Sequence, residues 1–335
     1  MAVGGPDSRL IVLTIASTNY HRVIDNWQIH MKKLGQLNYI ILCTQLSMFE
    51  TLDKHHAVLL EFSIPLTNTF DLTSEGQSRN SSGALSRQTD KSRRFKNPSS
   101  APKYADKSLG VGYAVMLTAK YHTILALLAT NISVVWSDSD AVWLRPCIFY
   151  YLINNDVRRA DLVGQQGIHP IHISKQTGAS ICAGFFVVNP TVSSIHLLAS
   201  VRDKLLGFMT SSNPRMNCDQ SILNSEIMRR SGFGVLPLRE KLNQTYVDIQ
   251  FPSLPSVISG SMTMSITIGV LPYPYFPRGE LKANKDNRVK EFSHDSGAEW
   301  AQFRHQACLW HMLSDKSDNG KIIRMKNDNV YKVED

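Results

Sequence analysis

The segment VVWSDSDAVWL at residues 134–144 decides the fold of this chain. Apolar and aromatic residues on both sides enclose two carboxylates, Asp138 and Asp140. A short, continuous, β-branched run is typical of a strand buried inside a parallel sheet. Open α/β sheets bind ligands at the carboxyl ends of their strands, so we expect the acidic pair to lie at a binding site.

The segments that precede this strand predict the rest of a parallel sheet. RLIVLTIA at 9–16, LNYIILC at 37–43 and AVLLEF at 57–62 have the composition of buried strands. Between the first two, apolar residues recur at helical spacing as far as Gly35, which is expected to end the helix. Strand, helix and strand with short connections are typical of a right-handed βαβ unit. We therefore expect an α/β fold with a mostly parallel central sheet flanked by helices.

The remainder of the chain is predicted to complete one domain that spans residues 9–335. From Gly232 onward Pro and Gly are frequent, which favours an irregular C-terminal lobe packed on the sheet edge. Further helices are predicted at residues 109–129, 190–207 and 219–230, and further strands at residues 132–136 and 183–188.

The net charge of +8 is unevenly distributed along the 335 residues. Residues 85–107 carry seven basic and two acidic side chains, within a polar stretch at 71–108 that we expect to be a mobile basic loop. A nucleic-acid patch is the alternative, but only Phe95 and Tyr104 in this run offer stacking. We expect a solvated loop and no nucleic-acid partner.

Signals for the cellular compartment are few. No stretch reaches the ~20 apolar residues of a membrane span, and the first eight residues lack the pattern of a signal peptide. We expect the Golgi lumen if this chain is a fragment of a type II membrane precursor, and the cytoplasm if it is the full chain. The five cysteines form no CxxC pair, and their odd number leaves a free thiol or an intermolecular bridge. Glycosylation sequons occur at Asn80, Asn131 and Asn243.

The spacing of Asp138 and Asp140 predicts a metal site. Side chains alternate along extended backbone, so the two carboxylates are expected to point the same way. Because like charges repel at short range, one carboxylate would be protonated unless a cation lay between them. Hard oxygen ligands suit Mn²⁺ or Mg²⁺. The alternative is a solvated surface turn, which the crowded Trp, Val and Leu residues on both sides disfavour.

At these residues the chain resembles the nucleotide-diphospho-sugar transferases of glycosyltransferase family 77. The pattern of that family is a strand, Asp-x-Asp and an apolar-Trp-Leu-Arg-x-Pro run, and residues 138–146 read DSDAVWLRP, one residue shorter before the Pro. Asn26-Trp27 in the first helix, Gly184 in AGFFVVN and the segment CDQSILN at 218–224 also match.

The resemblance covers about residues 9–70 and 108–335. It implies a single GT-A domain, a UDP-sugar donor, Mn²⁺ with Mg²⁺ as the alternative ion, and retention of anomeric configuration. The chain departs from the family after the second strand, where CTQ at 43–45 replaces an acidic residue.

The resemblance also implies a third metal ligand near the C-terminus. In the family a His precedes a basic residue by about ten positions, and His311 precedes Lys321 by that interval. His311 would join Asp138 and Asp140 at the metal, and the ammonium of Lys321 would neutralise the leaving diphosphate. His305 is the rival ligand.

The residues at the transferred sugar are likewise implied by the resemblance. Asp219 and Gln220 would lie against the sugar, although Asp219 also suits a helix N-cap and the identity of any nucleophile stays open. Lys120 would reach the sugar or the diphosphate, or extend its ammonium to solvent. Other residues expected at the nucleotide-sugar are Thr14, Ala16, Ser17, Asp138, Ser139 and Gly184.

We therefore predict a metal-dependent retaining glycosyltransferase. It would move a sugar of the galactose, xylose or arabinose class from a UDP-sugar to a hydroxyl of a glycan or protein. The alternative is a non-catalytic relative that binds a nucleotide-sugar or a glycan. A sugar nucleotidyltransferase is disfavoured because STNYH at 17–21 is not the Gly-rich, basic loop that such enzymes carry after the first strand.

Overall fold

The computed structural model describes most of the α/β core of the chain. The residues that the structure describes all belong to one compact unit. The predicted basic loop at 71–108 lies outside the described residues. The described residues are 9–16, 20–36, 38–60, 111–153, 160–167, 169–177, 180–210, 218–231, 249–251, 266–271, 275–277, 281–283, 289–292, 304–311 and 318–333.

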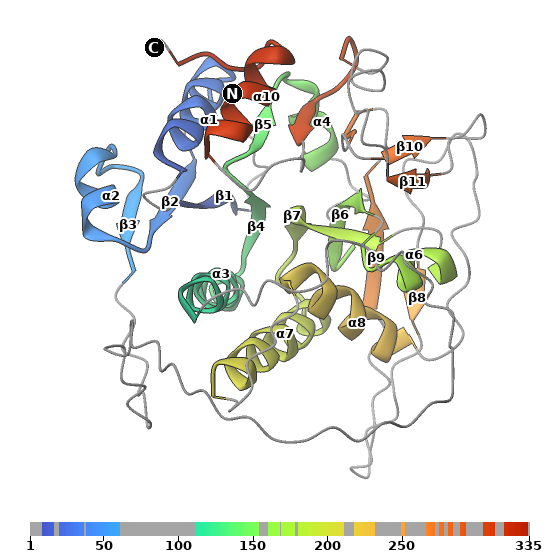
Figure 1. Ribbon diagram of the computed structural model, residues 1–335. Helices are drawn as coiled ribbons and strands as arrows, with labels where there is room; N and C mark the ends of the chain where they lie inside the picture. Colours follow the sequence, from blue (N-terminus) through green and yellow to red (C-terminus); the bar gives the residue numbers. More distant parts are fainter. Residues whose placement is uncertain are drawn as a thin grey trace, which may run out of the picture. The chain divides into compact units, whose positions relative to one another are not determined.

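The centre of the described unit is an eight-stranded sheet in the order β3-β2-β1-β4-β7-β6-β9-β8 (Figure 1). Strands β3, β2, β1 and β4 run parallel to one another, and β6 runs parallel to β9. β7 is antiparallel to both of its neighbours, and β8 is antiparallel to β9. The bounds are β1 Arg9–Ala16, β2 Tyr39–Cys43, β3 Ala57–Leu59, β4 Ile132–Ser137, β6 Leu162–Gly167, β7 Ser180–Val188, β8 Ile249–Phe251 and β9 Ile266–Val270.

The predicted βαβ unit is confirmed at the amino-terminal side of the sheet. Helix α1 (His21–Lys33) connects β1 to β2, which pair in parallel with Val12 opposite Tyr39. The helix stops where Gly35 adopts a φ of +69°, a left-handed conformation that glycine enters at no steric cost. The N–H of Gly35 donates to the carbonyl of Lys32, which closes the last turn.

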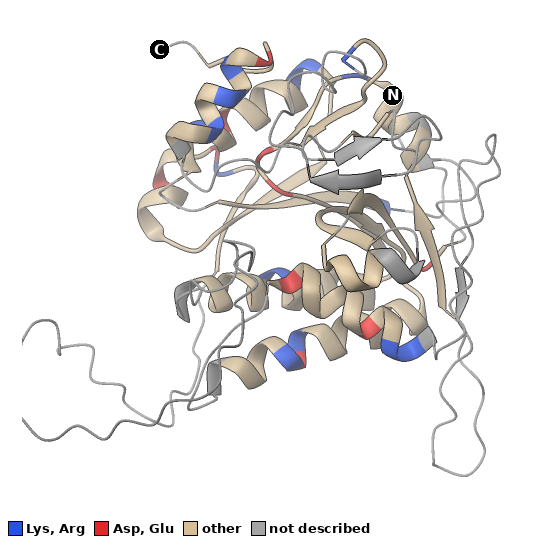
Figure 2. Cartoon of the chain, turned by 45° about the vertical axis from the view of Figure 1, so that its right-hand side comes forward, with Lys and Arg blue, Asp and Glu red and all other residues tan. Residues whose placement is uncertain are grey.

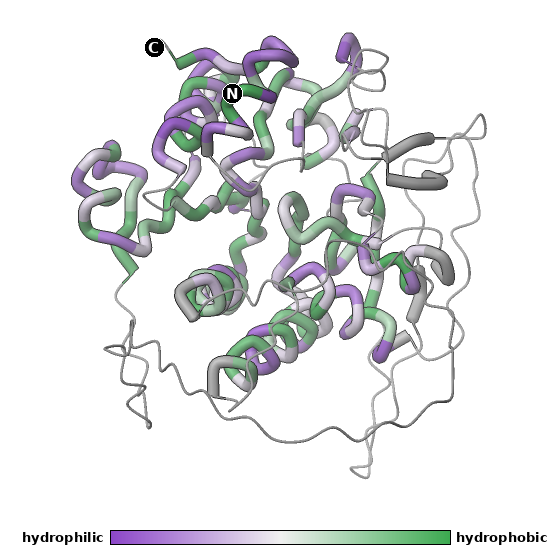
Figure 3. The backbone as a smooth tube through the Cα atoms, in the orientation of Figure 1, coloured by the Kyte–Doolittle hydropathy of each residue, from purple (hydrophilic) through white to green (hydrophobic). Residues whose placement is uncertain are grey.

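Helices cover both faces of the sheet. On one face lie α3 (Val111–Ala129), α7 (Val192–Thr210) and α8 (Asp219–Ser231), as Figure 1 shows. The strands send alternate side chains to the two faces, so Leu13 packs towards α3 while Val12 packs towards α1. The strands are largely hydrophobic, whereas hydrophilic positions gather on α1 and α10 (Figure 3). The other helices are α2 Leu46–Thr51, α4 Cys147–Ile153, α6 Ile171–Thr177 and α10 Asp318–Asn327.

The C-terminal third contributes more to the central sheet than the Pro- and Gly-rich sequence indicates. β9 pairs with β6, and β8 extends the sheet beyond it. β12 (Leu309–His311) pairs with β5 (Ala141–Trp143) in a separate two-stranded sheet, and β10 (Leu281–Ala283) pairs with β11 (Val289–Phe292) in another. These short strands depend on partners far away in the chain, and therefore local sequence patterns predict them poorly.

Charged side chains are carried mainly by the helices and connecting segments, and the strands of the sheet carry few (Figure 2). Within the described part of the chain, no helix has the length and apolar character needed to cross a bilayer. The described α/β architecture, with its mostly parallel sheet, confirms the predicted fold class.

Candidate metal and donor site

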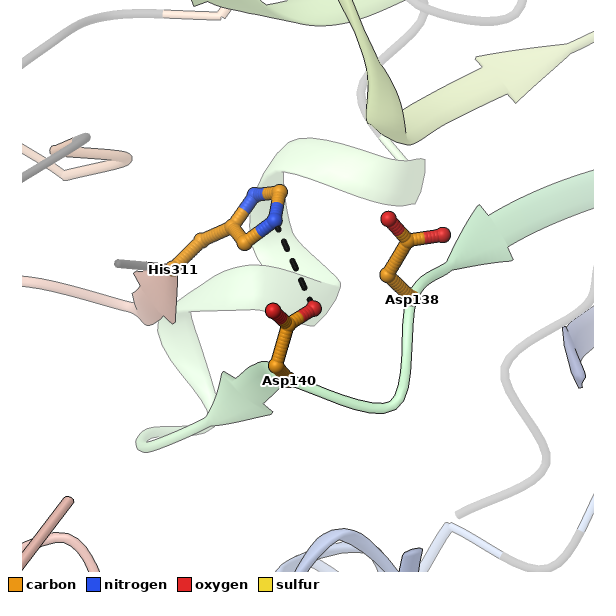
Figure 4. Close-up of side chains that lie close together, drawn as sticks. All are labelled: Asp138, Asp140 and His311. Atoms are coloured by element: carbon orange, nitrogen blue, oxygen red, sulfur yellow. Dashed lines mark ion pairs between the residues drawn. The ribbon is translucent and has the colours of Figure 1, made fainter. Parts of the chain in front are cut away.

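The acidic pair lies in a tight turn at the carboxyl end of β4. The strand ends at Ser137, and the N–H of Ala141 donates to the carbonyl of Asp138 across the turn. We predicted that Asp138 and Asp140 point the same way because side chains alternate along an extended strand. That reason was wrong, since the two residues lie in a turn after the strand. It is the turn that brings their side chains towards each other (Figure 4).

A buried hydroxyl holds the base of this turn. The indole N–H groups of Trp27 and Trp143 both donate to the Oγ of Ser137, at 3.2 and 3.0 Å. The same Oγ lies 3.3 Å from the carbonyl oxygen of Ala141, to which it donates. Because all of these groups are buried, the network fixes the turn relative to α1 and β5.

His311 reaches the acidic pair from the far end of the chain. β12 pairs with β5 so that His311 lies opposite Ala141, the residue that follows Asp140. One ligand atom of each of Asp138, Asp140 and His311 lies within 4.8 Å of the others. Figure 4 shows the three side chains close together, with His311 coming from β12 and the two aspartates from the turn after β4. His305, the rival, is exposed and contacts Arg304 instead.

The two carboxylates have different electrostatic surroundings. Burial raises the pKa of Asp138 to about 6, although Lys120 opposes this shift. Burial acts in the same direction on Asp140, but Lys321, joined by His311 whenever that imidazole is protonated, outweighs it and holds the pKa of Asp140 below its usual value. Lys321, on α10, forms an ion pair with Asp140. The Lys that the resemblance implies at the diphosphate is thus beside the acidic pair.

Gly184 leaves space beside the side chains of Asp138 and His311. A Cβ at this position would lie 2.6 Å from Oδ2 of Asp138 and 2.9 Å from Nε2 of His311. The backbone of β7 is also tied to the turn, since the N–H of Asp138 donates to the carbonyl of Gly184 at 2.7 Å. Two carboxylates and an imidazole form a donor set that suits Mn²⁺ or Mg²⁺. The space beside them is one that even a methyl group would fill, and this makes it a suitable cradle for such an ion.

Lys120 and Asp219 form a buried ion pair next to this cradle. The Nζ of Lys120 donates to Oδ2 of Asp219 at 2.8 Å and to the carbonyl of Ala183 at 2.7 Å. The ammonium also lies 4.5 Å from the ring centroid of Trp136. Lys120 is 2% exposed, so the alternative that it extends to solvent was wrong. The pair holds the start of α8 against β7, one residue from Gly184.

Gln220 and Asn224 fasten α8 to the same strand. Nε2 of Gln220 donates to the carbonyl of His169 at 2.6 Å, and its Oε1 accepts from the N–H of Ala183 at 3.4 Å. Asn224 bonds to both the N–H and the carbonyl of Ile181. The CDQSILN segment therefore places Asp219 and Gln220 beside the acidic turn through backbone contacts with β7.

Replacing Lys120 by methionine is expected to lower the free energy of unfolding by about 3–5 kcal/mol. The methionine fills the apolar surroundings but leaves the buried Asp219 carboxylate without its cation. Urea denaturation monitored by circular dichroism measures the change. Lys204→Met is the matched control, because Lys204 is half exposed and its partner Glu226 keeps Arg229. A Lys120→Met protein as stable as the control would contradict the expected cost.

The remaining predicted donor residues that the structure describes lie near the ends of β1 and β4. Thr14 and Ala16 are fully buried near the carboxyl end of β1. Ser139 is partly exposed at the tip of the acidic turn, and Ser17 lies outside the described residues. Their roles at a nucleotide stay predictions.

Gln165 is the polar residue of this site that sequence reasoning missed. It is fully buried on β6, and its Oε1 lies 2.6 Å from Nδ1 of His311. The stretch LVGQQG that forms β6 has two Gly and two Gln residues, which weaken any strand signal. The available clue was that the two glutamines lie between two glycines and follow a run of apolar residues.

A disulfide joins the two strands that carry the site. Cys147 follows β5 at the start of α4, and Cys308 immediately precedes β12, with their Cα atoms 5.6 Å apart. Cys43 and Cys182 are buried free thiols, and Cys218 is a partly buried one. The bridge closes a loop of 161 residues and keeps His311 beside the acidic turn.

Reduction of this bridge is expected to lower the free energy of unfolding by about 2–5 kcal/mol, because the unfolded chain regains the freedom that the loop removes. Guanidinium denaturation with and without dithiothreitol measures the difference. The Cys147→Ser/Cys308→Ser protein should match the reduced wild type and show no further response to dithiothreitol. An unchanged midpoint after reduction of the wild type would contradict the expectation.

The family model described as nucleotide-diphospho-sugar transferase matches residues 86–325, which is more than half of the chain. A search of curated proteins finds no match.

Two solved structures show a distant likeness to this chain. The WbbM bifunctional glycosyltransferase in its apo form is 12% identical with a TM-score of 0.45, and the match covers 93% of this chain but 47% of WbbM. The chain thus spans about half the length of that protein. The galactosyltransferase LgtC, solved with donor and acceptor sugar analogues, is 10% identical with a TM-score of 0.36, and the match covers 64% of this chain and 69% of LgtC. On the strength of the family match, this chain belongs to the nucleotide-diphospho-sugar transferases.

Proposed function

We propose that the chain is a metal-dependent glycosyltransferase that moves a sugar from a UDP-sugar to a hydroxyl of a glycan or protein. The observation that carries the proposal is that one ligand atom from each of Asp138, Asp140 and His311 lies within 4.8 Å of the others, with Gly184 leaving space beside Asp138 and His311. Membership of the nucleotide-diphospho-sugar transferase family supports a nucleotide-sugar donor.

Asp138, Asp140 and His311 would hold the ion, Mn²⁺ by preference and Mg²⁺ as the alternative. When bound, such an ion acts as a Lewis acid that stabilises negative charge on a leaving diphosphate. Lys321 contributes a second positive charge from α10, and it already contacts Asp140. The ammonium is held in place before the donor arrives, which favours electrostatic stabilisation of charge that develops during reaction.

Asp219 and Gln220 would face the transferred sugar, and retention of anomeric configuration is part of the proposal. Lys120, Tyr121 and the N–H of Gln220 all bond to the Asp219 carboxylate, which fixes its orientation. Which group lies beneath the anomeric carbon stays open. The sugar class, galactose, xylose or arabinose, is likewise proposed from the family resemblance alone.

Release of UDP tests the proposal without knowledge of the acceptor. Purified protein is incubated with a panel of UDP-sugars and Mn²⁺, Mg²⁺ or EDTA. Slow hydrolysis of one donor that depends on the metal is the expected result. Tight binding of a UDP-sugar without turnover under any metal would favour the non-catalytic alternative, and neither binding nor turnover would contradict both.

We further propose that the chain works in the Golgi lumen, as expected for a fragment of a type II membrane precursor, with the cytoplasm as the alternative if it is the full chain. The Cys147–Cys308 disulfide supports an oxidising compartment. Asn131, one of the three sequon residues, is exposed in the turn before β4. Expression of the protein in its own cells, followed by protease protection and endoglycosidase digestion, tests the location. A protein accessible from the cytoplasm, with both of these cysteines reduced, would overturn it.

A further inference from the structure

The imidazole of His311 has a different neighbour at each nitrogen. Nε2 lies 3.7 Å from Oδ1 of Asp140, on the side of the acidic turn. Nδ1 lies 2.6 Å from Oε1 of Gln165, on the opposite side, and at a longer 3.9 Å from Sγ of Cys182. A neutral imidazole carries a proton on one nitrogen and a lone pair on the other, and a metal binds only the lone pair. The contact at Nδ1 therefore determines what Nε2 can do.

The orientation of the Gln165 amide is set by the backbone around it. Its Nε2 donates to the carbonyl oxygens of Phe276 and Pro277, at 3.2 and 3.0 Å. A flipped amide would place Oε1 against two carbonyl oxygens, which are all acceptors, inside a buried site. Oε1 must therefore face His311, and because Oε1 can only accept, Nδ1 of His311 must donate.

The fold also explains why Gln165 can make this contact. The pairing between β6 and β7 shifts register between Gly164 and Gln166, an irregularity of the kind that re-aims a side chain. Residues 275–277 are bonded in turn to the start of β12, since the N–H of Cys308 donates to the carbonyl of Tyr275. The amide thus bridges β6 to the segment that carries His311.

We infer that Gln165 is a positioning residue that fixes His311 in the Nδ1–H tautomer and so presents the Nε2 lone pair to the space between Asp138 and Asp140. The metal role of that lone pair rests on the proposed function, whereas the tautomer does not. Hydrogen bonds of this kind to a ligating His commonly change metal affinity 10–100-fold when removed.

Nuclear magnetic resonance of metal-free protein labelled with ¹⁵N-histidine tests the inference directly. At pH 8 an ordinary histidine is neutral, and the nitrogen–proton couplings of the ring identify the protonated nitrogen. His311→Gln assigns the signal. The expected result for the wild type is the Nδ1–H form. An Nε2–H form or an imidazolium in the wild type would overturn the inference, and this measurement needs no variant at Gln165.

Gln165→Leu removes the acceptor, and Gln166→Leu is the matched control one residue further along β6. We expect Gln165→Leu to lose the pure Nδ1–H form and to weaken Mn²⁺ binding, measured by calorimetry, roughly 10–100-fold. The control should change neither. A Gln165→Leu protein that keeps the Nδ1–H form would overturn the inference. If the tautomer responds as expected but the wild type binds no Mn²⁺, the inference is supported and the metal proposal fails.

Discussion

Replacing Asp140 by asparagine is expected to lower kcat/KM for UDP release from the donor by about 10²–10³-fold. Asparagine keeps the shape of the side chain but removes the negative charge that faces His311 and Lys321. A divalent ion would lose one of two anionic ligands, and Lys321 would be left without its carboxylate. Coupled-enzyme detection of UDP measures the effect.

Asp203→Asn is the matched control for this substitution. Asp203 is exposed on α7, where it forms an ion pair with its neighbour Arg202. The control should retain wild-type turnover and Mn²⁺ affinity. Thermal unfolding of both variants separates loss of function from loss of fold. An Asp140→Asn protein with turnover within threefold of the wild type would remove Asp140 from the proposed mechanism.

Replacing Gly184 by alanine is expected to abolish Mn²⁺ binding and to reduce UDP release at least 100-fold. The added methyl group would lie 2.5 Å from Cε1 of His311 and 2.6 Å from Oδ2 of Asp138, closer than non-bonded atoms approach. Either the two side chains move apart or β7 shifts. Overpacking of a buried site costs about 1–3 kcal/mol of stability, which differential scanning calorimetry measures beside the metal titration.

Gly207→Ala gives the same chemical change in open surroundings. Within the described part of the chain, no atom beyond its immediate helical neighbours lies within 4 Å of the position that the new Cβ would occupy. Because Gly207 is exposed in helix α7, alanine should stabilise the protein by about 0.5–1 kcal/mol and leave metal binding unchanged. If alanine destabilises the protein at position 184 but stabilises it at position 207, the effect of Gly184→Ala comes from the surroundings of Gly184 in the cradle. Normal Mn²⁺ affinity in Gly184→Ala would show that the ion binds elsewhere.

Much of the fold was predictable because it depends on local periodicity. The strands at 9–16 and 132–137, and the helix at 21–33, carry continuous or helically spaced apolar residues that local patterns detect well. β6 was missed because LVGQQG buries a glutamine and two glycines. Its strand conformation comes from β7 and β9 on either side, so the contacts that stabilise it are absent from its own sequence.

The sequence by itself predicted a metal site at the acidic turn. Two aspartates after a buried strand led us to expect a compensating cation, and the resemblance added His311 and Lys321 as candidates. Only the tertiary structure decided which of His305 and His311 joins the pair. The reason is that β12 pairs with β5 across more than 160 positions of sequence, a contact that no local spacing encodes. Tertiary structure also decided the turn geometry, the burial of Lys120 against Asp219 and the contact between Gln165 and Nδ1 of His311. Each of these depends on atoms that folding alone brings within hydrogen-bonding distance.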